Sequence, residues 1–408
     1  MKILIYGINY SPELVGVGKY TGEMARWLAA EGKDVRVVTA PPYYPEWRIS
    51  DGYRNAYSRS QDGDVEVIRC PMYVPSNPST LSRMLHLFSF SLSSAFPVLG
   101  SASWKPDVII QVVPTLFCSF QTLLLARLTG AKTVVHIQDY EVAAMFKISM
   151  ARGTWLKRFA FWAERKILDS FDIVSTISSG MIEVAVSKGL DPEKVVFFPN
   201  WSEVERFRNV QSTQGVLKKL GIDTDKKIVL YSGNLGEKQG LETVVHVAKR
   251  LASNPDIHFM IVGEGSAKRQ LEYLASELSL TNITFSPLQS YEDLPELLAA
   301  ASCHLVIQKF GAADAVMPSK LTNILAVGGN AVITATRDTS LGLLCYDHDG
   351  IATLVEPESI EALHDGILAT LALPTPNPVA LKYAEEFLEK GKILDRFVSA
   401  VSNPTCMT

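Results

Sequence analysis

The segment from residue 226 to residue 330 constrains the fold most, because apolar runs in it end in turns that precede helix-like sequence. Residues 226–236 read KKIVLYSGNLG, and residues 257–265 read IHFMIVGEG. A third run, residues 303–308, leads through a loop to MPSKLTNILAVGG at 317–329. A helix start offers unpaired N–H groups and a positive dipole end, which favour an anion. Several such turns at one edge of a parallel sheet predict a nucleotide-binding site.

Length and charge limit the class of protein. A chain of 408 residues exceeds what one ordinary hydrophobic core serves, so two domains are expected. The net charge of −4 lacks the basic excess of a nucleic-acid binder, and no nucleic acid is expected as a partner. The five cysteines are scattered and mostly lie in apolar runs, which indicates buried thiols in a reducing cytoplasm. The apolar start, residues 2–8, is too short for a signal peptide and predicts a buried strand.

Apolar runs alternate with helix-period segments along the whole chain. In the first half these runs cover 2–8, 35–39, 65–69, 107–113, 133–137, 173–177 and 195–198. After a break near residue 200 they resume at 228–231, 258–262, 283–285, 303–308, 331–334 and 352–355. Such a pattern indicates parallel sheets covered by helices. We therefore predict an α/β fold with doubly wound domains at 1–200 and 203–375, and a helical segment at 378–403 that packs back across the hinge.

Two places in the first half are candidate ligand contacts. Gly16 and Gly18 open a helix-like segment and would let a ligand approach the backbone closely, although a turn that needs positive φ would also select glycine. His136 and Asp139 lie at the carboxyl end of the predicted strand 133–137, where open α/β sheets bind ligands. His136 would contact a sugar or phosphate, with Asp139 orienting it or the acceptor. The alternative is a partly buried histidine with a backbone partner.

The second half offers a helix start with a lysine. Pro318 suits the first turn of a helix, since its missing N–H has no partner there. The amides of Ser319, Lys320 and Leu321 would then point out of the helix, and Lys320 adds a full charge. The alternative is an ordinary capped helix with a solvated lysine.

The glycine turns after the first two strands of the second domain supply further candidates. Gly233, Asn234, Gly263 and Gly265 would bring backbone and amide groups to a diphosphate. Lys238 would face that diphosphate from the opposite side and neutralise a leaving group, or it is only a solvated turn residue.

Two Asp-x-Asp strings, at 223–225 and 347–349, could hold a divalent cation. Both lie in polar, turn-like sequence, which favours ordinary loops. Because lysines and helix ends can neutralise a diphosphate, no metal and no other cofactor is expected.

Residues 84–104 contain no Asp, Glu, Lys or Arg and approach the length of a membrane-spanning helix. Their serines and Pro97 disfavour insertion, and the segment lies between two predicted strands of one sheet. It is interpreted as a domain helix whose outer surface rests on a bilayer, or as a simple core helix.

In combination these segments resemble the retaining glycosyltransferases of family 4, which have the GT-B fold. The likeness covers nearly the whole chain and is carried by GVG at 16–18, HIQD at 136–139, FFPN at 197–200, GNLG at 233–236, IVGEG at 261–265, and the helical segments 294–301 and 383–401. It implies two Rossmann-like domains facing across a cleft, with a C-terminal helix that crosses back to the first.

The resemblance also implies the reaction. A sugar would pass from a nucleotide-diphosphate donor to an acceptor with retention of anomeric configuration and without a protein nucleophile. The chain is most similar to family members that act in exopolysaccharide (colanic acid) biosynthesis. That similarity implies fucose from GDP-fucose, a polyprenyl-diphosphate-linked saccharide as acceptor, and a peripheral location at the cytoplasmic face of the inner membrane.

The chain departs from the family where a pair of glutamates usually contacts the donor. Ala315 and Asn323 stand in their places, so Asn323 could still bind ribose but Ala315 cannot replace a carboxylate. Asn234 stands where the family has arginine, and Gln239 where it has lysine.

These departures leave Lys238 and Lys320, together with His136, as the candidate catalytic residues. Two other classes stay open at this point. One is a sugar-nucleotide 2-epimerase, and the other is a non-enzymatic, two-lobed sugar-nucleotide-binding protein.

Overall fold

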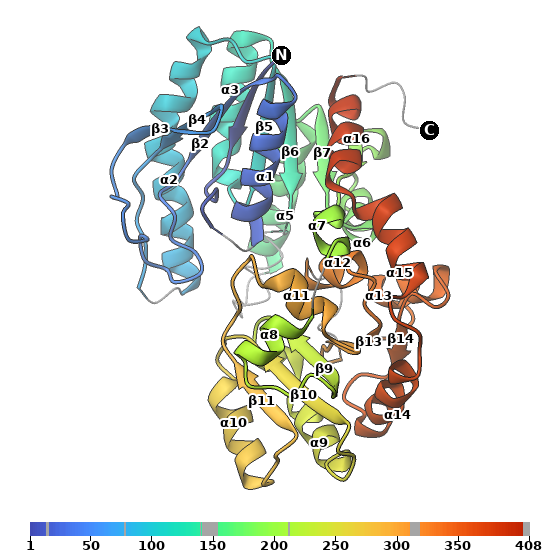
Figure 1. The fold of residues 1–408 in the computed structure, drawn as a ribbon. Coiled ribbons are helices and arrows are strands. Elements are labelled where there is room, and N and C mark those ends of the chain that lie inside the picture. The colour runs from blue at the N-terminus through green and yellow to red at the C-terminus, as the bar shows by residue number, and fades with distance from the viewer. Residues whose placement is uncertain are drawn as a thin grey trace. The chain divides into compact units, whose positions relative to one another are not determined.

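The structure, a computed structural model, describes residues 1–13, 16–76, 79–138, 140, 154–210, 213–310 and 319–402. These residues form two compact units (Figure 1). Unit 1 contains the described residues within 1–198 and 397–402, and unit 2 contains those within 199–396. Each unit is a sheet with helices packed on both faces, which confirms the predicted α/β class.

The described sheet of unit 1 has the strand order β3-β4-β2-β1-β5-β6-β7-β8. Its strands are β1 (Lys2–Tyr6), β2 (Asp34–Thr39), β3 (Ser58–Asp62), β4 (Val65–Arg69), β5 (Val108–Val113), β6 (Lys132–Ile137), β7 (Ile173–Thr176) and β8 (Val195–Phe197). Its helices are α1 (Gly16–Ala30), α2 (Thr80–Gly100), η1 (Ser101–Ser103), η2 (Leu116–Cys118), α3 (Ser119–Thr129), α5 (Thr154–Asp169), α6 (Ser179–Ser187) and η3 (Pro192–Lys194).

One strand of unit 1 was absent from the predicted pattern. β3 reads SRSQD, is largely exposed, and pairs antiparallel with β4. A strand at a solvated sheet edge needs no apolar side chains, so the sequence of β3 has no hydrophobic pattern from which a strand could be predicted. The other strand pairs of this sheet are parallel, as predicted.

The described sheet of unit 2 is parallel throughout, in the order β11-β10-β9-β12-β13-β14. Its strands are β9 (Lys227–Ser232), β10 (Ile257–Val262), β11 (Ile283–Ser286), β12 (Cys303–Val306), β13 (Ala331–Thr334) and β14 (Thr353–Val355). Its helices are α7 (Val204–Arg208), α8 (Gln214–Lys219), η4 (Glu237–Gln239), α9 (Glu242–Arg250), α10 (Lys268–Glu277), α11 (Leu294–Ala299), α12 (Ser319–Ala326), α13 (Ser340–Asp347), α14 (Ile360–Leu371), α15 (Pro378–Tyr383) and the π-helical turn η5 (Ala384–Leu388).

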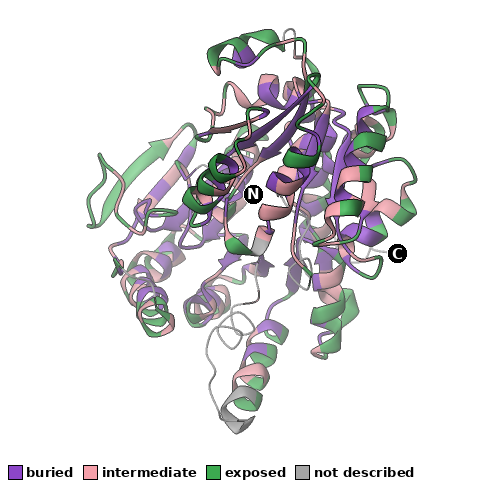
Figure 2. Ribbon diagram, turned by 90° about the horizontal axis from the view of Figure 1, so that it is seen from below, coloured by how far each residue is buried: buried purple, intermediate pink, exposed green. Residues whose placement is uncertain are grey.

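Alternate residues of β9 enter two different hydrophobic cores. Ile228 and Leu230 belong to the core that includes α12, whereas Val229 and Tyr231 belong to the core that includes α9 and α14. Successive side chains of a strand point to opposite faces, so a strand apolar on every residue must be covered on both sides. In Figure 2 most strands of the sheets are coloured as buried.

The closing helix α16 (Lys390–Ser402) contributes its last residues to unit 1. There Phe397 stacks on Phe198 with ring centroids 3.9 Å apart and planes 9° apart. Lys132 Nζ donates to the carbonyl of Val401 at 2.5 Å. These contacts attach the end of the described chain to the sheet that its first residues begin.

Candidate functional site

The strand order of unit 2 reverses between β9 and β12. From β9 the sheet continues through β10 and β11 on one side, and through β12, β13 and β14 on the other. Open α/β sheets bind ligands outside the carboxyl ends of the strands at such a point. Gly233 directly follows β9, and α12 is the helix that follows β12. A ligand site of unit 2 is therefore expected near the end of β9 and the start of α12.

Lys320, in the first turn of α12, extends over this point. Its Nζ lies 3.9 Å from the centre of the Tyr231 ring. A Cβ built on Gly233 would lie 3.7 Å from the same nitrogen. The lysine, the aromatic ring and the glycine turn therefore form one cluster, which we call the Lys320 cluster.

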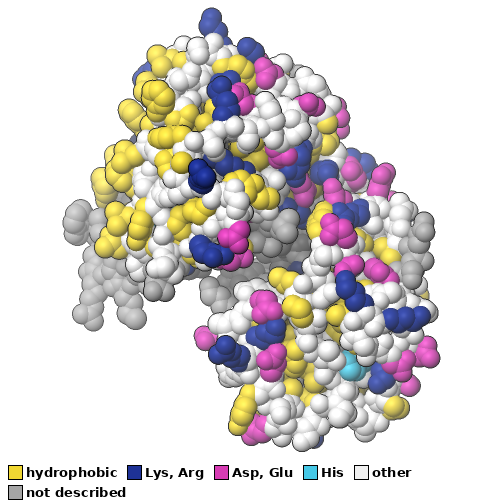
Figure 3. Space-filling view, turned by 60° about the vertical axis from the view of Figure 1, so that its left-hand side comes forward, with side chains coloured by type: hydrophobic (Ala, Val, Ile, Leu, Met, Phe, Trp, Pro, Cys, Tyr) yellow, Lys and Arg dark blue, Asp and Glu magenta, His cyan; other side chains and the backbone are white. Residues whose placement is uncertain are grey.

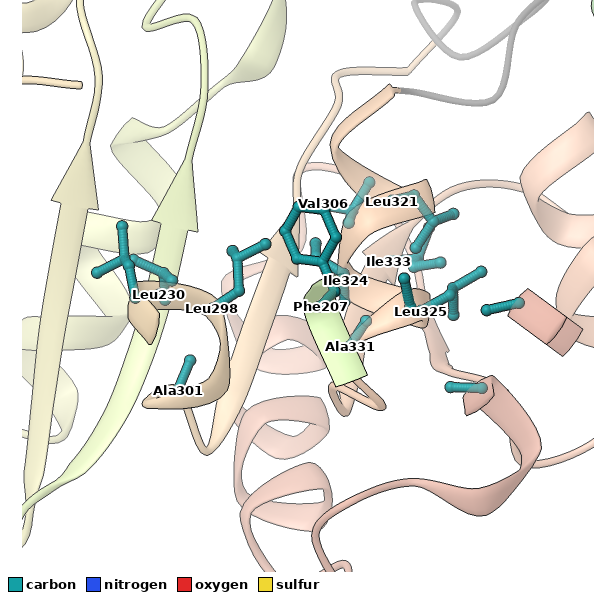
Figure 4. Close-up of a cluster of buried hydrophobic side chains, with 14 of the residues drawn as sticks. Phe207, Leu230, Leu298, Ala301, Val306, Leu321, Ile324, Leu325, Ala331 and Ile333 are labelled. Atoms are coloured by element: carbon teal, nitrogen blue, oxygen red, sulfur yellow. The ribbon is translucent and has the colours of Figure 1, made fainter. Parts of the chain in front are cut away.

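Core packing fixes the helix that carries Lys320. Leu321, Ile324 and Leu325 are buried in the core on this face of the sheet (Figure 4). The side chain of Leu321 is fully buried, so only its backbone N–H stays a candidate for ligand binding. Because these apolar positions recur at helical spacing, they anchor one side of α12 and leave Lys320 on another.

The ammonium of Lys320 is desolvated without a compensating charge. Burial lowers its pKa from 10.5 to about 7, although the residue keeps intermediate exposure, and no charged group among the described residues opposes that shift. The ring face of Tyr231 supplies a weak cation–π attraction. Among the described residues no carboxylate pairs with Lys320. An anionic ligand would supply that charge and return the lysine to its protonated form.

The glycine turns pack against each other. A Cβ on Gly263 would lie 1.9 Å from the carbonyl oxygen of Gly233, and one on Gly265 would lie 2.4 Å from that of Leu235. The Leu235 N–H also donates to the carbonyl of Glu264 at 2.9 Å. Close approach of the two turns accounts for Gly263 and Gly265 without a ligand.

Tyr231 also holds the first turn in place. Its hydroxyl donates to the carbonyl of Asn234 at 2.7 Å. Burial raises the pKa of Tyr231, so the phenol stays protonated as a donor. The Asn234 side chain is exposed beside this turn. Sequence reasoning missed Tyr231, because an aromatic residue at the end of an apolar strand has the signature of a core residue.

Asn323, also on α12, accepts a hydrogen bond from the Ser202 hydroxyl at 2.9 Å through its Oδ1. In the described part of the chain the amide nitrogen of Asn323 has no such contact, which leaves a donor for a ligand. The structure thus gives Asn323 a fixed orientation, and its role in ribose binding stays a prediction.

In unit 1 a buried carboxylate, that of Glu13, lies against the first turn of α1. Glu13 Oε1 accepts from the backbone N–H groups of Tyr43 and Tyr44, both at 3.2 Å, and its Oε2 accepts from Asn9 Nδ2 at 2.9 Å. A Cβ on Gly18 would lie 2.4 Å from Glu13 Oε2. Burial raises the pKa of Glu13. A protein carboxylate therefore already packs against Gly18.

Gly16, by contrast, adopts φ of +60° with open space where a Cβ would stand. Position 16 requires glycine because of its positive φ, whereas position 18 requires glycine because a Cβ there would meet the Glu13 side chain. The diphosphate contact predicted for both glycines stays a prediction. Sequence reasoning missed Glu13, because a carboxylate in a loop is most often solvated.

His136 is buried inside unit 1. Its Nδ1 lies 3.0 Å from the Ser175 hydroxyl, and its Nε2 lies 3.3 Å from Gln138 Nε2. The ring packs on Phe198 with centroids 4.9 Å apart. Burial lowers the pKa of His136 to about 3, so the ring is neutral. These contacts suit a structural histidine with side-chain partners, and they give no support to a catalytic role.

Several predicted site residues lie outside the described part of the chain. Asp139 and Pro318 fall in gaps, and the side chains of Lys238 and Ser319 are not described. Within the described residues, no group of three or more His, Cys, Asp or Glu could hold a metal. Of the predicted residues, the structure brings together Gly233, Gly263, Gly265 and Lys320.

Comparisons with known proteins cover both units. Residues 15–201 match the family model described as a glycosyl transferase 4-like domain, and residues 214–392 match the model described as glycosyl transferases group 1. WcaI of Escherichia coli (strain K12), an inferred colanic acid biosynthesis glycosyl transferase, is 55% identical over 98% of this chain and 100% of its own length.

Solved structures share the fold at low identity. Sucrose-phosphate synthase from Thermosynechococcus elongatus has a TM-score of 0.72 and 17% identity, covering 98% of each chain. Anabaena Alr3699/HepE in complex with UDP has a TM-score of 0.69 and 14% identity, covering 98% of this chain and 100% of that one. WaaG, a glycosyltransferase involved in lipopolysaccharide biosynthesis, has a TM-score of 0.66 and 16% identity over 98% and 100%.

Proposed function

Because the chain belongs to the glycosyltransferase family that these two domain models describe, we propose that it transfers fucose from GDP-fucose to a lipid-linked saccharide. Its enzyme class, a glycosyltransferase of the two-domain GT-B fold, follows from the family itself. The family therefore favours a glycosyltransferase over the two alternatives left open by the sequence, a sugar-nucleotide 2-epimerase and a non-enzymatic sugar-nucleotide-binding protein. The donor, the acceptor and the stereochemistry are the proposal.

The full-length relative carries this proposal. An identity of 55% over 98% of the chain supports a shared role with WcaI in colanic acid biosynthesis. The acceptor in such a pathway is proposed to be a saccharide on polyprenyl diphosphate. That acceptor would place the enzyme peripherally at the cytoplasmic face of the inner membrane.

The Lys320 cluster supports a nucleotide-diphosphate donor. We assign the donor diphosphate to the end of β9, where the Gly233 turn and the Lys320 ammonium meet. The acceptor hydroxyl oxygen would bond to the anomeric carbon while the bond from that carbon to the phosphate oxygen breaks. The departing phosphate oxygen would take the acceptor proton on the same face, which retains configuration. Lys320 would stabilise the negative charge that develops on the leaving group.

The test begins with a thermal-shift panel of GDP-, UDP-, CDP- and dTDP-sugars. A ligand at 100 times its Kd stabilises the folded state by about 2.7 kcal/mol, so the correct donor should stand out. Donors that bind are then incubated with a polyprenyl-diphosphate-linked saccharide, and the product anomer is determined. Transfer from GDP-fucose with retention is expected. Transfer from another nucleotide sugar alone would refute the proposed donor, and an inverted product would refute the proposed stereochemistry.

A further inference from the structure

Helix α2 in unit 1 presents an apolar stripe to solvent. Leu81, Leu85, Phe88, Leu92 and Phe96 are all exposed, from 48% for Phe88 to 83% for Phe96. Spacings of three and four residues place them on one side of the helix. The residues on its other side, including Leu87, Phe90 and Val98, are buried in the core of unit 1.

The stripe continues onto the start of α3. Phe88 meets the Phe117 ring edge to face, with centroids 6.0 Å apart. The Ser91 hydroxyl donates to the carbonyl of Phe117, in η2, at 2.8 Å. Gln121 Nε2, in α3, donates to the Ser91 hydroxyl at 2.9 Å and so joins α3 to α2. Phe120, one turn further along, is 73% exposed. We call the exposed residues Leu81, Leu85, Phe88, Leu92, Phe96 and Phe120 the α2–α3 apolar surface.

Figure 3 brings forward the side of the molecule on which Figure 1 labels α2. Large apolar side chains gather on unit 1 in that view. A contiguous exposed patch of this kind marks a site of membrane or protein contact. By length and composition alone residues 80–103 could cross a membrane. One side of α2 packs in unit 1, however, and the sheet continues on both sides of it in sequence. The helix is thus suited to lie on a bilayer rather than to span it.

The charges around the surface identify the occupant. Within residues 80–129, which include α2 and α3, the sequence has one acid, Asp107, against the bases Arg83, Lys105 and Arg127, and all four are exposed. The backbone N–H of Lys2 donates to Asp107 at 2.6 Å. The chain as a whole has a net negative charge, which an anionic membrane repels. The region around α2 and α3 has more bases than acids, so an anionic membrane attracts it.

A groove with arginines adjoins the end of the stripe. It has a volume of about 980 Å³, and its lining includes Phe96, Tyr57 and Arg59. Arg59 and Arg36 share one carboxylate, that of Glu66, so the three side chains keep one net positive charge. This groove suits a phospholipid, because its apolar wall can contact the acyl chain and its net positive charge can attract the anionic phosphate.

We propose that the α2–α3 apolar surface docks on an anionic phospholipid bilayer. The inference rests on the membrane location in the proposed function. Its test measures lipid binding without donor or acceptor, so failure of docking is distinguishable from failure of the proposed transfer reaction.

The experiment is co-sedimentation of the full chain with vesicles of phosphatidylcholine, with and without phosphatidylglycerol. Leu92→Ser with Phe96→Ser should weaken binding by about tenfold or more for each side chain, because each loses its transfer into the apolar phase. Tyr273→Ser with Tyr346→Ser is the matched control, since both tyrosines are exposed on unit 2. Arg83→Gln should weaken binding only to vesicles that contain phosphatidylglycerol.

Three outcomes would overturn the proposal. One is that the unaltered chain fails to bind either vesicle, and another is that the serine variant binds as tightly as the control variant. The third is that the unaltered chain binds no lipid but self-associates in sedimentation velocity, and that the serine variant does not self-associate. That result would assign the surface to a second copy.

Discussion

The ammonium of Lys320 lies 3.9 Å from the centre of the Tyr231 ring, over the turn that Gly233 begins. The two residues come from different elements, the first turn of α12 and the end of β9. They meet at the reversal point of the unit 2 sheet, where a ligand is expected. Since burial lowers the pKa of Lys320 to about 7, the cluster would gain most from a ligand that brings negative charge.

Replacing Lys320 should remove most turnover. Lys320→Ala is expected to lower kcat by about 10² to 10³, because removal of one donor to the developing charge typically costs that much. Lys249→Ala, on helix α9 at the opposite face of the sheet, is the control for a lysine outside the cluster. The measurement is initial rate at saturating donor, with circular dichroism as a check of folding. Turnover near that of the control would remove Lys320 from the mechanism.

Donor affinity should fall as pH rises above 7. In the free protein Lys320 loses its proton near pH 7, whereas a bound diphosphate favours the charged form. Binding therefore takes up a proton above pH 7, and Kd should rise by at most about tenfold per pH unit. Calorimetry with an intact nucleotide sugar in buffers of different ionisation enthalpy measures this uptake. Lys320→Arg should lose the dependence, since arginine stays charged. A Kd equal at pH 7 and pH 9 would contradict the assignment.

The same lysine should make the folded state less stable. Its pKa is about 7 folded and near 10.5 unfolded, so below pH 7 the folded chain holds a desolvated charge. Between pH 7 and 10.5 the unfolded chain binds more protons, and stability therefore rises with pH in that window. Lys320→Met should be more stable than the unaltered chain at pH 6.5. That advantage should shrink by at most about 1.4 kcal/mol per pH unit toward pH 10. Urea unfolding of both proteins at several pH values tests this, and a constant difference would refute it.

Much of the fold and part of the site follow from the sequence, for identifiable reasons. Val229 and Leu230 are both apolar because each faces a different core, so the parallel sheet was predictable. The position of Lys320 in the first turn of a helix was predictable because Pro318 marks a helix start, whereas its role in a site stays a prediction. β3 was not, since an exposed polar edge strand has no hydrophobic period.

The contacts of individual polar groups could not be predicted, because they depend on residues distant in sequence. His136 lies at the expected strand end, but Ser175 and Phe198 surround it. Glu13 is buried because its partners, Tyr43 and Tyr44, come from the loop after another strand. Local sequence shows neither the partner nor the burial, so it cannot distinguish a ligand-binding group from a structural one.

Close packing of the glycine turns makes Gly263 sensitive to the smallest substitution. Gly263→Ala would place a methyl 1.9 Å from the Gly233 carbonyl oxygen, and the two turns would have to separate. We expect a loss of about 1–3 kcal/mol in the free energy of unfolding, together with weaker donor binding. Gly100→Ala is the control, since a methyl there meets no atom within 4 Å. Denaturant unfolding and donor titration of both variants decide the matter, and equal effects would contradict the packing argument.

Glu13 should stabilise unit 1 as an acceptor for two neighbouring backbone N–H groups. Glu13→Ala leaves the N–H groups of Tyr43 and Tyr44 without this partner in a buried setting. Each unsatisfied donor costs about 1–3 kcal/mol, so the loss should clearly exceed that of Glu31→Ala, an exposed carboxylate. Glu13→Gln keeps an acceptor oxygen and should retain much of the stability. If Glu13→Ala unfolds at the same denaturant concentration as Glu31→Ala, the carboxylate does not hold the loop. If the alanine and glutamine variants are equally unstable, the loss comes from the charge rather than from the hydrogen bonds.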